Sequence, residues 1–334
     1  MPARPYAYVT ADVFTDRQFG GNPLAVVLDA RGLSDAEMLA VTREFNYAET
    51  TFVLPPERGG AARVRIFTPG GEVPFAGHPT VGTAHVLFAT GALRAEGDER
   101  TIILEEQVGD VAVRVRTAGG AAALGDGPLV APEPAFAELT AAAPPTERAA
   151  PDVALLAEAL SLDAGDVLGG DYAPRVASCG LPFTLVPVRS RAAVARARVR
   201  ADAWERAYAG PAWGRGVSEG AMVFTTDAAD GFDPSTGSGQ AVHARVFVPD
   251  LAVPEDPATG SAAAALGGYL ARRTPRLDGA LSWAVAQGVE MGRPSRLLVS
   301  ADKRGGEVAA VRVGGQAVVV CAGTMYVRDG GVRA

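Results

Sequence analysis

The feature of this sequence that most constrains its fold is an internal repeat. Arg65–Pro69 reads RIFTP, and Arg245–Pro249 reads RVFVP. The pair Val73–Pro74 follows the first segment at the same distance as Val253–Pro254 follows the second. Similar motifs at a constant interval indicate that one supersecondary unit has been duplicated. We therefore expect the 334 residues to form two similar halves, which agrees with roughly 100–200 residues per domain.

Three further pairs of segments recur in the same order along the chain. Each match is weak by itself, but their common order argues for an ancient duplication. The pairs are Pro79–Ala84 (PTVGTA) with Pro257–Ala262 (PATGSA), Gly21–Leu24 (GNPL) with Gly180–Phe183 (GLPF), and Glu49 with Glu219, each of which stands shortly before an apolar pair.

Short runs of Val, Ile and Leu between Gly and Pro residues predict many short strands joined by turns. A helix is expected to start at Ser34, because Glu37 follows at the spacing of a capping box. Further helices are expected to begin at Thr80, Pro151 and Thr259. The strands expected in the first half are Tyr6–Phe14, Ala25–Leu28, Thr51–Leu54, Arg63–Phe67, Thr101–Glu105 and Val111–Arg116.

A stretch rich in Pro and Ala lies near the middle of the chain, at Gly127–Asp152. Proline has no backbone N–H to donate, so this stretch is not expected to sustain a helix or a central strand. We expect it to be the crossing between two domains. The first domain would comprise residues 1–127, completed by a C-terminal strand at about 322–334, and the second residues 128–321, with the crossing at 128–152.

Composition and charge exclude several classes of protein. With 48% hydrophobic and 21% charged residues, the chain can build a core and is not a disordered protein. Its net charge of −7 gives no reason to expect nucleic acid or an anionic membrane as a partner. Two cysteines cannot form a disulfide framework or a multi-cysteine zinc site. Without an apolar signal core or a membrane-spanning stretch, we expect a cytoplasmic protein.

The repeated segment places a helix start after a strand and a proline-containing loop. Glycines near these starts, at Gly77, Gly82 and Gly260, let a ligand approach the backbone closely. The first N–H groups of a helix have no partner within it and favour an anion. Two such starts facing one cleft would bind a small carboxylate, whereas the alternative is that both are merely well-capped helices. Hydroxyl donors to this site would be Thr80, Thr83, Thr259 and Ser261.

A series of short motifs runs in order along the chain: Asp12–Thr15 (DVFT), Gly21–Pro23 (GNP), Ala48–Phe52 (AETTF), Phe75–Thr80 (FAGHPT), Glu255–Ala262 (EDPATGSA), Gln287–Gly288 (QG) and Met291–Ser295 (MGRPS). Together they resemble the motifs of the PhzF (phenazine biosynthesis) family of isomerases, and the resemblance extends from about Tyr8 to Val327. Two segments depart from the family's pattern, the Pro/Ala stretch before Asp152 and the insertion Asp233–Gln240, and both lie outside the motifs.

The resemblance implies an α+β fold of the diaminopimelate-epimerase type. Such a fold has two pseudo-symmetric domains, each a β-barrel wrapped around a central helix, with the active site between them. It also implies a cofactor-independent isomerase that moves a proton within a small carboxylic acid, cyclic or not, that bears an amino or hydroxyl group. The family's archetypal activity isomerises a dihydro-hydroxyanthranilate. We expect a homodimer that binds neither metal nor cofactor and takes a small-molecule carboxylate as its substrate.

The resemblance also suggests roles for individual residues. Glu49 stands where the family has its proton-shuttling glutamate, and a carboxyl group in a closed, partly apolar cleft has the raised pKa that a general acid and base needs. The alternative for a lone glutamate is a surface position. His78 would bind polar groups of the substrate or help to move a proton. Asp256 would bind a substrate amine or hydroxyl, or would cap the following helix. The residues expected to hold the substrate are Gly77, Thr80, Thr259, Gly260 and Ser261.

Other enzyme classes fit the sequence less well. A racemase with two thiols is excluded, because Cys179 and Cys321 lie in apolar runs away from both repeated motifs. Gly216–Gly220 matches the Gly-x-Ser-x-Gly pattern of serine hydrolases, but Ala221–Phe224 continues as a strand where that motif needs a helix. A non-catalytic carboxylate-binding protein and a related epimerase or dehydratase stay open as alternatives.

Overall fold

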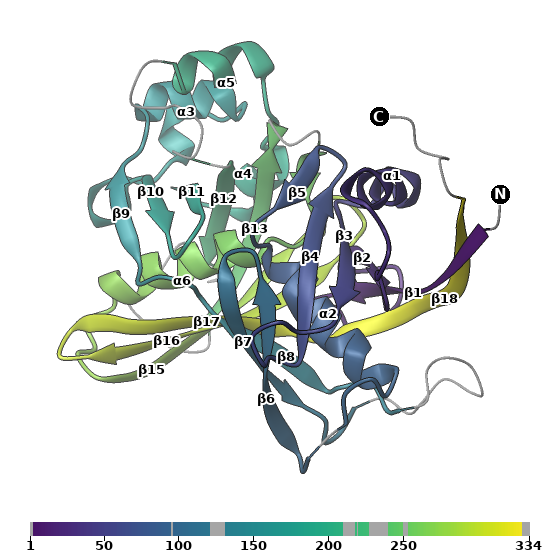
Figure 1. Ribbon diagram of the computed structural model, residues 1–334. Coiled ribbons are helices and arrows are strands. Elements are labelled where there is room, and N and C mark those ends of the chain that lie inside the picture. The colour runs from purple at the N-terminus through teal and green to yellow at the C-terminus, as the bar shows by residue number, and fades with distance from the viewer. Residues whose placement is uncertain are drawn as a thin grey trace. The chain divides into compact units, whose positions relative to one another are not determined.

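In the computed structural model, residues 3–94, 96–120, 131–209, 218, 220–226, 240–249 and 253–328 are described (Figure 1). The chain divides into two compact units. The first comprises Met1–Thr140 and Gly314–Ala334, and the second Ala141–Val313. The second unit is thus shorter at both ends than the range 128–321 expected from the sequence, and the C-terminal strand belongs to the first unit.

The first unit surrounds one buried helix with strands. Helix α2, Gly77–Ala89, is buried at every position. A helix that is apolar on all its faces is stable only where other elements enclose it, and α2 contacts strands of its own unit on several sides (Figure 1). Helix α1, Asp35–Phe45, packs instead against strands β3 and β4. The strands are β1 Ala3–Val13, β2 Asn22–Val27, β3 Glu49–Leu54, β4 Ala62–Thr68, β5 Gly71–Val73, β6 Glu99–Glu106, β7 Gly109–Arg116, β8 Phe136–Thr140 and β18 Ala317–Arg328.

The second unit has a central helix of the same kind. Helix α6, Gly260–Arg273, is buried from Gly260 to Ala271 except at Ser261, and it contacts strands β10, β11, β15 and β16. No helix within the described ranges is long and apolar enough to cross a membrane. The other helices are α3 Val153–Ala159, α4 Arg191–Arg196, α5 Ala201–Ala207 and the short 3-10 turns η1 Ala164–Asp166 and η2 Gly170–Tyr172. The strands are β9 Thr146–Ala149, β10 Arg175–Ser178, β11 Pro182–Pro187, β12 Ala221–Thr226, β13 Gln240–Val248, β14 Val253–Asp256, β15 Gly279–Gln287, β16 Ser295–Arg304 and β17 Glu307–Gly315.

Both units pair their strands in the same way. In the first unit, β2 pairs with β3 in parallel, and β3 pairs with β4 in antiparallel orientation. Strand β4 then pairs antiparallel with β5 and parallel with β6. In the second unit, β11 pairs with β12 in parallel, and β12 pairs with β13 in antiparallel orientation. Strand β13 then pairs antiparallel with β14 and parallel with β15. The central helix follows β5 in one unit and β14 in the other. The structure therefore confirms that the chain contains two similar halves.

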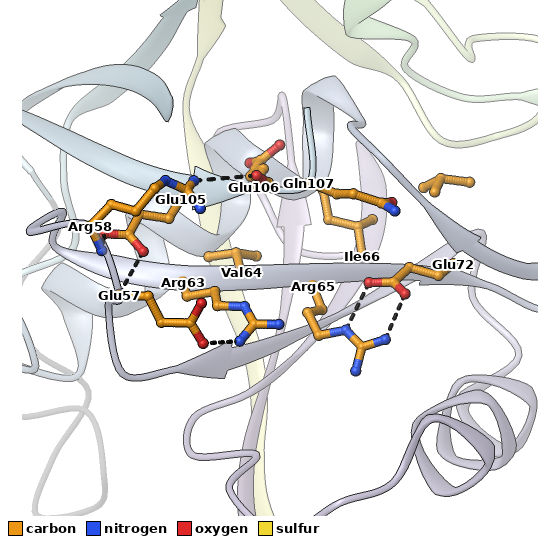
Figure 2. Close-up of a pocket in the computed structure, with 11 residues that line it drawn as sticks. Glu57, Arg58, Arg63, Val64, Arg65, Ile66, Glu72, Glu105, Glu106 and Gln107 are labelled. Atoms are coloured by element: carbon orange, nitrogen blue, oxygen red, sulfur yellow. Dashed lines mark hydrogen bonds and ion pairs between the residues drawn. The ribbon is translucent and has the colours of Figure 1, made fainter. Parts of the chain in front are cut away.

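One side-chain interaction explains why the RIF and RVF segments recur. Arg65 of β4 lies with Cζ 5.1 Å from the centroid of the Phe67 ring. Its Nε and Nη2 donate to the two carboxylate oxygens of Glu72 on β5, at 2.7 and 2.6 Å (Figure 2). A planar guanidinium can stack on an aromatic ring and bind both oxygens of a carboxylate at once, which lysine cannot do. The arginine thereby ties the β4–β5 hairpin together.

The second unit repeats this interaction with Arg245 of β13. Its Cζ lies 4.9 Å from the centroid of the Phe247 ring, and it donates to both carboxylate oxygens of Glu255 at 2.7 Å. Glu255 stands opposite Phe247 in the strand pair, as Glu72 stands opposite Phe67. The two carboxylates are therefore counterparts, and this fixes the alignment of the two halves.

The two Val-Pro pairs matched in sequence are not structural counterparts. Val73 stands opposite Ile66, and Asp256 occupies the same place in the second unit. Val253 instead stands opposite Val248, beyond a register shift in β13. This register shift changes the number of residues that separates equivalent positions of the two halves, and a match of short motifs does not detect such a change.

Helix α2 begins earlier than its sequence suggests. Its first residue is Gly77, so the expected start at Thr80 is wrong. Pro79 falls in the first turn, where the missing N–H costs nothing because those groups have no partner within the helix. Gly77 and Gly260 are therefore the matching first residues of the two central helices.

The other expected helix starts agree with the structure. Ser34 caps α1, and both hydrogen bonds of its capping box with Glu37 are present. Helices α3 and α6 begin at Val153 and Gly260, close to the positions expected for them.

The Pro/Ala-rich stretch carries more regular structure than its composition suggests. Strand β8 pairs with β7, and β9 pairs with β10, both antiparallel. Pro132 and Pro134 precede β8, and Pro144 and Pro145 precede β9, so the residues without an N–H stay outside both ladders. The expectation that this stretch sustains no central strand is wrong for β8, which pairs with both β7 and β17.

The packing of α2 against its strands gives a first prediction. A Cβ atom on Gly82 would lie 2.6 Å from Leu24 Cδ2 and 2.6 Å from Val13 Cγ2, both of them buried. Gly82→Ala should therefore lower the free energy of unfolding by about 1–3 kcal/mol, even though alanine is the better helix former. Urea unfolding measures the change. Gly165→Ala is the control, because a Cβ there meets nothing within 4 Å, and equal stability of the two variants would contradict this account.

Candidate active site

Two chemically active side chains meet at the start of α2. Glu49 is the first residue of β3, held beside Leu24 of β2, and its side chain is 19% exposed. His78 is the second residue of α2, and its side chain is 4% exposed. The distance between Glu49 Oε2 and His78 Nε2 is 3.5 Å. The structure therefore brings together two of the three residues expected to be catalytic.

The imidazole of His78 is neutral. Burial lowers its pKa to about 3, while a backbone hydrogen bond to Pro23 acts in the opposite direction and does not offset it. The contact with Glu49 is therefore no ion pair at neutral pH. Within the described residues Nε2 has no hydrogen-bond partner, so this nitrogen faces the Glu49 carboxyl group as a neutral polar atom.

Asn22 of the GNP motif contacts His78, which the sequence alone does not predict. Asn22, the first residue of β2, is fully buried, and its Nδ2 lies 3.2 Å from Nδ1 of His78. The amide thus fixes the plane of the imidazole. Asn22 and His78 are far apart in the chain, so only the motif's resemblance to a family marked it.

Helix α2 leaves its first N–H groups without a side-chain cap. The residue at the N-cap position is Ala76, and the first hydrogen bond within the helix runs from Thr80 N to Ala76 O at 3.2 Å. The N–H groups of Gly77 and His78 therefore have no partner inside the helix. Helix α6 is similar, since Thr259 makes no side-chain cap hydrogen bond and the first bond runs from Ala263 N to Thr259 O.

The hydroxyl groups of Thr80 and Thr83 are engaged inside the first unit. Thr80 is fully buried, with Oγ1 2.8 Å from Ala76 O and 2.6 Å from Oε1 of Glu106. Thr83 Oγ1 lies 2.8 Å from Thr51 Oγ1. These hydroxyl groups hold the start of α2 in place, and the role of Thr80 in binding a substrate stays a prediction.

A hydrogen-bond network fixes the loop before α6. Thr259 Oγ1 donates to Asp256 Oδ2 at 2.5 Å. Gln287, the fully buried last residue of β15, donates from Nε2 to Asp256 O at 2.7 Å and to Thr259 Oγ1 at 3.0 Å, and accepts from Thr259 N at 3.2 Å. Asp256 is therefore not the N-cap of α6, which is Thr259, and its carboxylate is oriented by a hydroxyl donor.

The QG motif is explained by close backbone packing. Gly288 has a φ of +73°, and a Cβ there would lie 2.6 Å from Pro257 O and 2.4 Å from Arg293 O. Both the left-handed backbone and the contact require glycine. The turn thus supports the loop that carries Asp256.

The expected site residues divide between the two units. Gly77, His78, Glu49 and Thr80 belong to the first, and Asp256, Thr259, Gly260 and Ser261 to the second. That both groups share one cleft stays a prediction from the pseudo-symmetry.

The cysteines lie apart from the two helix starts. Cys179 is buried, with Sγ 3.4 Å from Ala264 O, and burial raises its pKa to about 12. Cys321 is exposed on β18. Among the described residues, no group of three or more His, Cys, Asp or Glu side chains could hold a metal ion.

The hydrolase-like motif lacks the required context. Most of Gly216–Gly220 and the insertion Asp233–Gln240, except its last residue, lie outside the described residues. Ser218 Oγ donates to Gly220 O at 2.8 Å, and strand β12 follows from Ala221. A nucleophile elbow needs a helix at that point.

Comparison with known proteins gives one consistent result. A family model described as phenazine biosynthesis-like protein (PhzC-PhzF) matches residues 11–323. An uncharacterized isomerase of Mesorhizobium japonicum is 36% identical, with 96% of this chain and 98% of that protein covered. The trans-2,3-dihydro-3-hydroxyanthranilate isomerase of Pseudomonas aeruginosa is 34% identical over 96% of this chain and 99% of that protein. The crystal structure of a Bacillus anthracis PhzF-family protein has the same fold, with a TM-score of 0.79 at 23% identity over 96% of this chain and 99% of that one.

The neutral state of His78 gives a second prediction, on stability. Its pKa is about 3 when folded against 6.5 ordinarily, so between these values the unfolded chain binds the extra proton. The contribution of His78 to the free energy of unfolding should therefore rise with pH over that window, and it should be lost as the pH falls from 6.5 toward 3. His78→Asn should flatten this slope in urea unfolding between about pH 4 and pH 7. Parallel slopes in the variant and the unmodified protein would show that His78 is protonated in the fold.

Proposed function

The chain belongs to the phenazine biosynthesis-like protein family and is an isomerase, and we propose that it moves a proton within a small carboxylic acid without a cofactor, with Glu49 as general acid and base. The observation that carries this proposal is the contact of 3.5 Å between Glu49 Oε2 and the neutral imidazole of His78. The relative in P. aeruginosa is named for a substrate that is a cyclic acid with amino and hydroxyl groups. We propose a substrate of that class.

The reaction needs one group that both takes and returns a proton. Glu49 as carboxylate removes a proton from a substrate carbon, and the electron pair of that C–H bond enters the adjoining unsaturated system. The same carboxyl group then delivers the proton to another carbon of that system, so that nothing is gained or lost. A neutral His78 suits this cycle, because it adds no charge beside Glu49 and leaves both forms of the carboxyl group accessible.

We propose that the substrate carboxylate binds at the two uncapped helix starts. The N–H groups at Gly77 and His78 in one unit and at Gly260 and Ser261 in the other are the donors. Each helix terminus favours an anion by about 0.3–1 kcal/mol, and by more where water is excluded. This proposal requires the two starts to face one cleft, as the internal repeat suggests.

Asp256 would select the substituents of the substrate. Its carboxylate is held by the Thr259 hydroxyl, and its backbone carbonyl by the buried Gln287. A carboxylate with a fixed orientation accepts from an amine or hydroxyl group of defined position. We propose that Asp256 plays this part opposite Glu49, in a cytoplasmic homodimer.

The third prediction tests the acid–base role. Glu49→Gln should fold normally and lose about 10²–10⁴ in the rate of solvent deuterium uptake into substrate, because an amide cannot shuttle a proton. The assay follows trans-2,3-dihydro-3-hydroxyanthranilate and a panel of small cyclic amino and hydroxy acids in deuterated water by mass spectrometry. Glu44→Gln is the matched control, since Glu44 is an exposed glutamate of the same unit. Near-normal deuterium uptake by Glu49→Gln would overturn the assignment, and binding without uptake by the unmodified protein would indicate a carboxylate-binding protein.

The fourth prediction concerns thiols and metals. Cys179→Ser combined with Cys321→Ser should keep most of the activity, because the proposed mechanism uses no thiolate and burial disfavours one at Cys179. Treatment with a chelator should also leave the activity in place. Loss of turnover in the chelator, restored by one particular divalent ion, would point to a metal-dependent reaction instead.

A further inference from the structure

Glu106 is a buried acid that the proposed mechanism does not use. It is the last residue of β6, is 3% exposed, and lines a cavity of about 270 Å³ between β4, β5 and β6 (Figure 2). Its carboxyl group contacts Thr80 of α2, while charged residues line the same cavity. Those that line the same cavity are Glu57, Arg58, Arg63, Arg65, Glu72 and Glu105.

The charged neighbours of Glu106 are occupied elsewhere. Arg65 is paired with Glu72, and Arg63 with Glu57, as Figure 2 shows. Arg58 pairs with Asp110 and reaches only the backbone carbonyl of Glu106, at 3.5 Å. Glu105 accepts from three backbone N–H groups, those of Glu57, Arg58 and Gly60. Within the described part of the chain, no arginine forms an ion pair with the Glu106 carboxyl group.

The hydrogen bonds of the Thr80 hydroxyl group indicate the protonation state of Glu106. The Thr80 oxygen lies 2.8 Å from Ala76 O and 2.6 Å from Glu106 Oε1, but the hydroxyl group has a single hydrogen to donate. Both short contacts are hydrogen bonds only if Glu106 supplies a proton to Thr80, which then donates to Ala76. The other oxygen, Oε2, is buried and has no partner among the described residues. Burying an oxygen without a partner costs less free energy in a neutral carboxyl group than in a carboxylate. Burial accordingly raises the pKa of Glu106 to about 8.

The second unit contains a neutral counterpart of Glu106. In β4 and β6, Arg63 pairs with Glu105, and in β13 and β15, His243 pairs with Ala286. The residue after each pairing is the last of its strand, Glu106 in one unit and Gln287 in the other. Gln287 holds the start of α6 with an amide that carries no charge at any pH. A protonated carboxyl group has the same shape as that amide, with one donor and one acceptor oxygen.

We propose that Glu106 is a positioning residue that works as a neutral carboxylic acid, which holds the first turn of α2, and with it His78, through Thr80 and Ala76. Ionisation of Glu106 breaks the chain of hydrogen bonds to Ala76 and loosens that turn. Activity should then fall on the alkaline side because His78 is displaced. The effect on activity rests on the proposed function, whereas the protonation and the loosening do not.

Infrared titration of the carboxyl groups tests the protonation directly. The unmodified protein should show the band of a protonated carboxylic acid that is lost as the pH rises through about 8. Glu106→Gln should remove this band, and Glu105→Gln should retain it, because hydrogen bonds from backbone N–H groups keep the pKa of Glu105 low against the effect of its burial. Absence of the band in the unmodified protein overturns the proposal, whatever its activity.

Hydrogen exchange tests the positioning without a substrate. After correction for the intrinsic rate, protection of the Thr80 N–H, which bonds to Ala76 O, should fall by up to about tenfold per pH unit as the pH approaches the pKa of Glu106 from below, and should become level above it. Glu106→Gln should remain protected throughout. If turnover is found, Glu106→Gln should also retain its kcat at alkaline pH. In the unmodified protein kcat should decrease there, and this decrease should exceed any change in KM. If the two proteins show identical hydrogen exchange and identical pH profiles, Glu106 serves only for packing and the proposal is wrong. If the expected exchange difference is found but the protein turns over no substrate, the result counts against the proposed function alone.

A matching effect is expected in stability. The folded pKa of about 8 lies above the ordinary 4.5, so the folded protein holds the extra proton between these values. The contribution of Glu106 to the free energy of unfolding should decline with rising pH across that window and become level above it. Glu106→Gln should lack this decline in urea unfolding, and an equal decline in both proteins would contradict the assignment.

Discussion

The structure depends on enclosing two helices that have no polar face. Every residue of α2 is buried, and α6 is buried over almost its whole length. Such a helix cannot lie on a surface, so strands must surround it, and its unpaired terminal N–H groups emerge only where the ring of strands ends. The short loops that precede α2 and α6 stand at these ends. A polar site at each helix start is therefore a consequence of the way each unit buries its core.

The internal repeat separates what holds the fold from what differs between the units. The arginine that stacks on a phenylalanine and grips a glutamate occurs in both, at Arg65 and at Arg245. The polar positions around the helix starts have diverged, since the second residue of the central helix is His78 in one unit and Ser261 in the other. Chemistry is thus distributed asymmetrically over a symmetric scaffold. In the function that we propose, the first unit supplies the acid–base group and the second supplies groups that bind the substrate.

Local patterns in the sequence predicted much of this arrangement, and long-range contacts account for what was missed. The capping box at Ser34 and the short strands of the first half follow from turn residues and apolar runs, and the structure confirms them. The roles of Asn22 and Gln287 were missed, because each acts on a residue distant in the chain through one buried amide. The start of α2 was misplaced because a proline in a first turn looks like a break. No pattern within one strand distinguishes Glu106, which is buried and tends to stay protonated, from its neighbour Glu105, whose carboxylate accepts three N–H groups.

The helices differ in whether the protein itself neutralises the positive end of the helix dipole. Helix α1 has Asp35 and Glu37 in its first turn and a side-chain cap, so its positive end is neutralised by the protein itself. Helices α2 and α6 have no acidic residue in the first turn and no side-chain cap. Burial also favours the neutral forms of two titratable groups at the start of α2, since it lowers the pKa of His78 and raises that of Glu106. Desolvation thus acts in opposite directions on an imidazole and a carboxyl group with one result, which is that neither group places a charge at the positive end of α2, and this agrees with the carboxylate binding that we propose there.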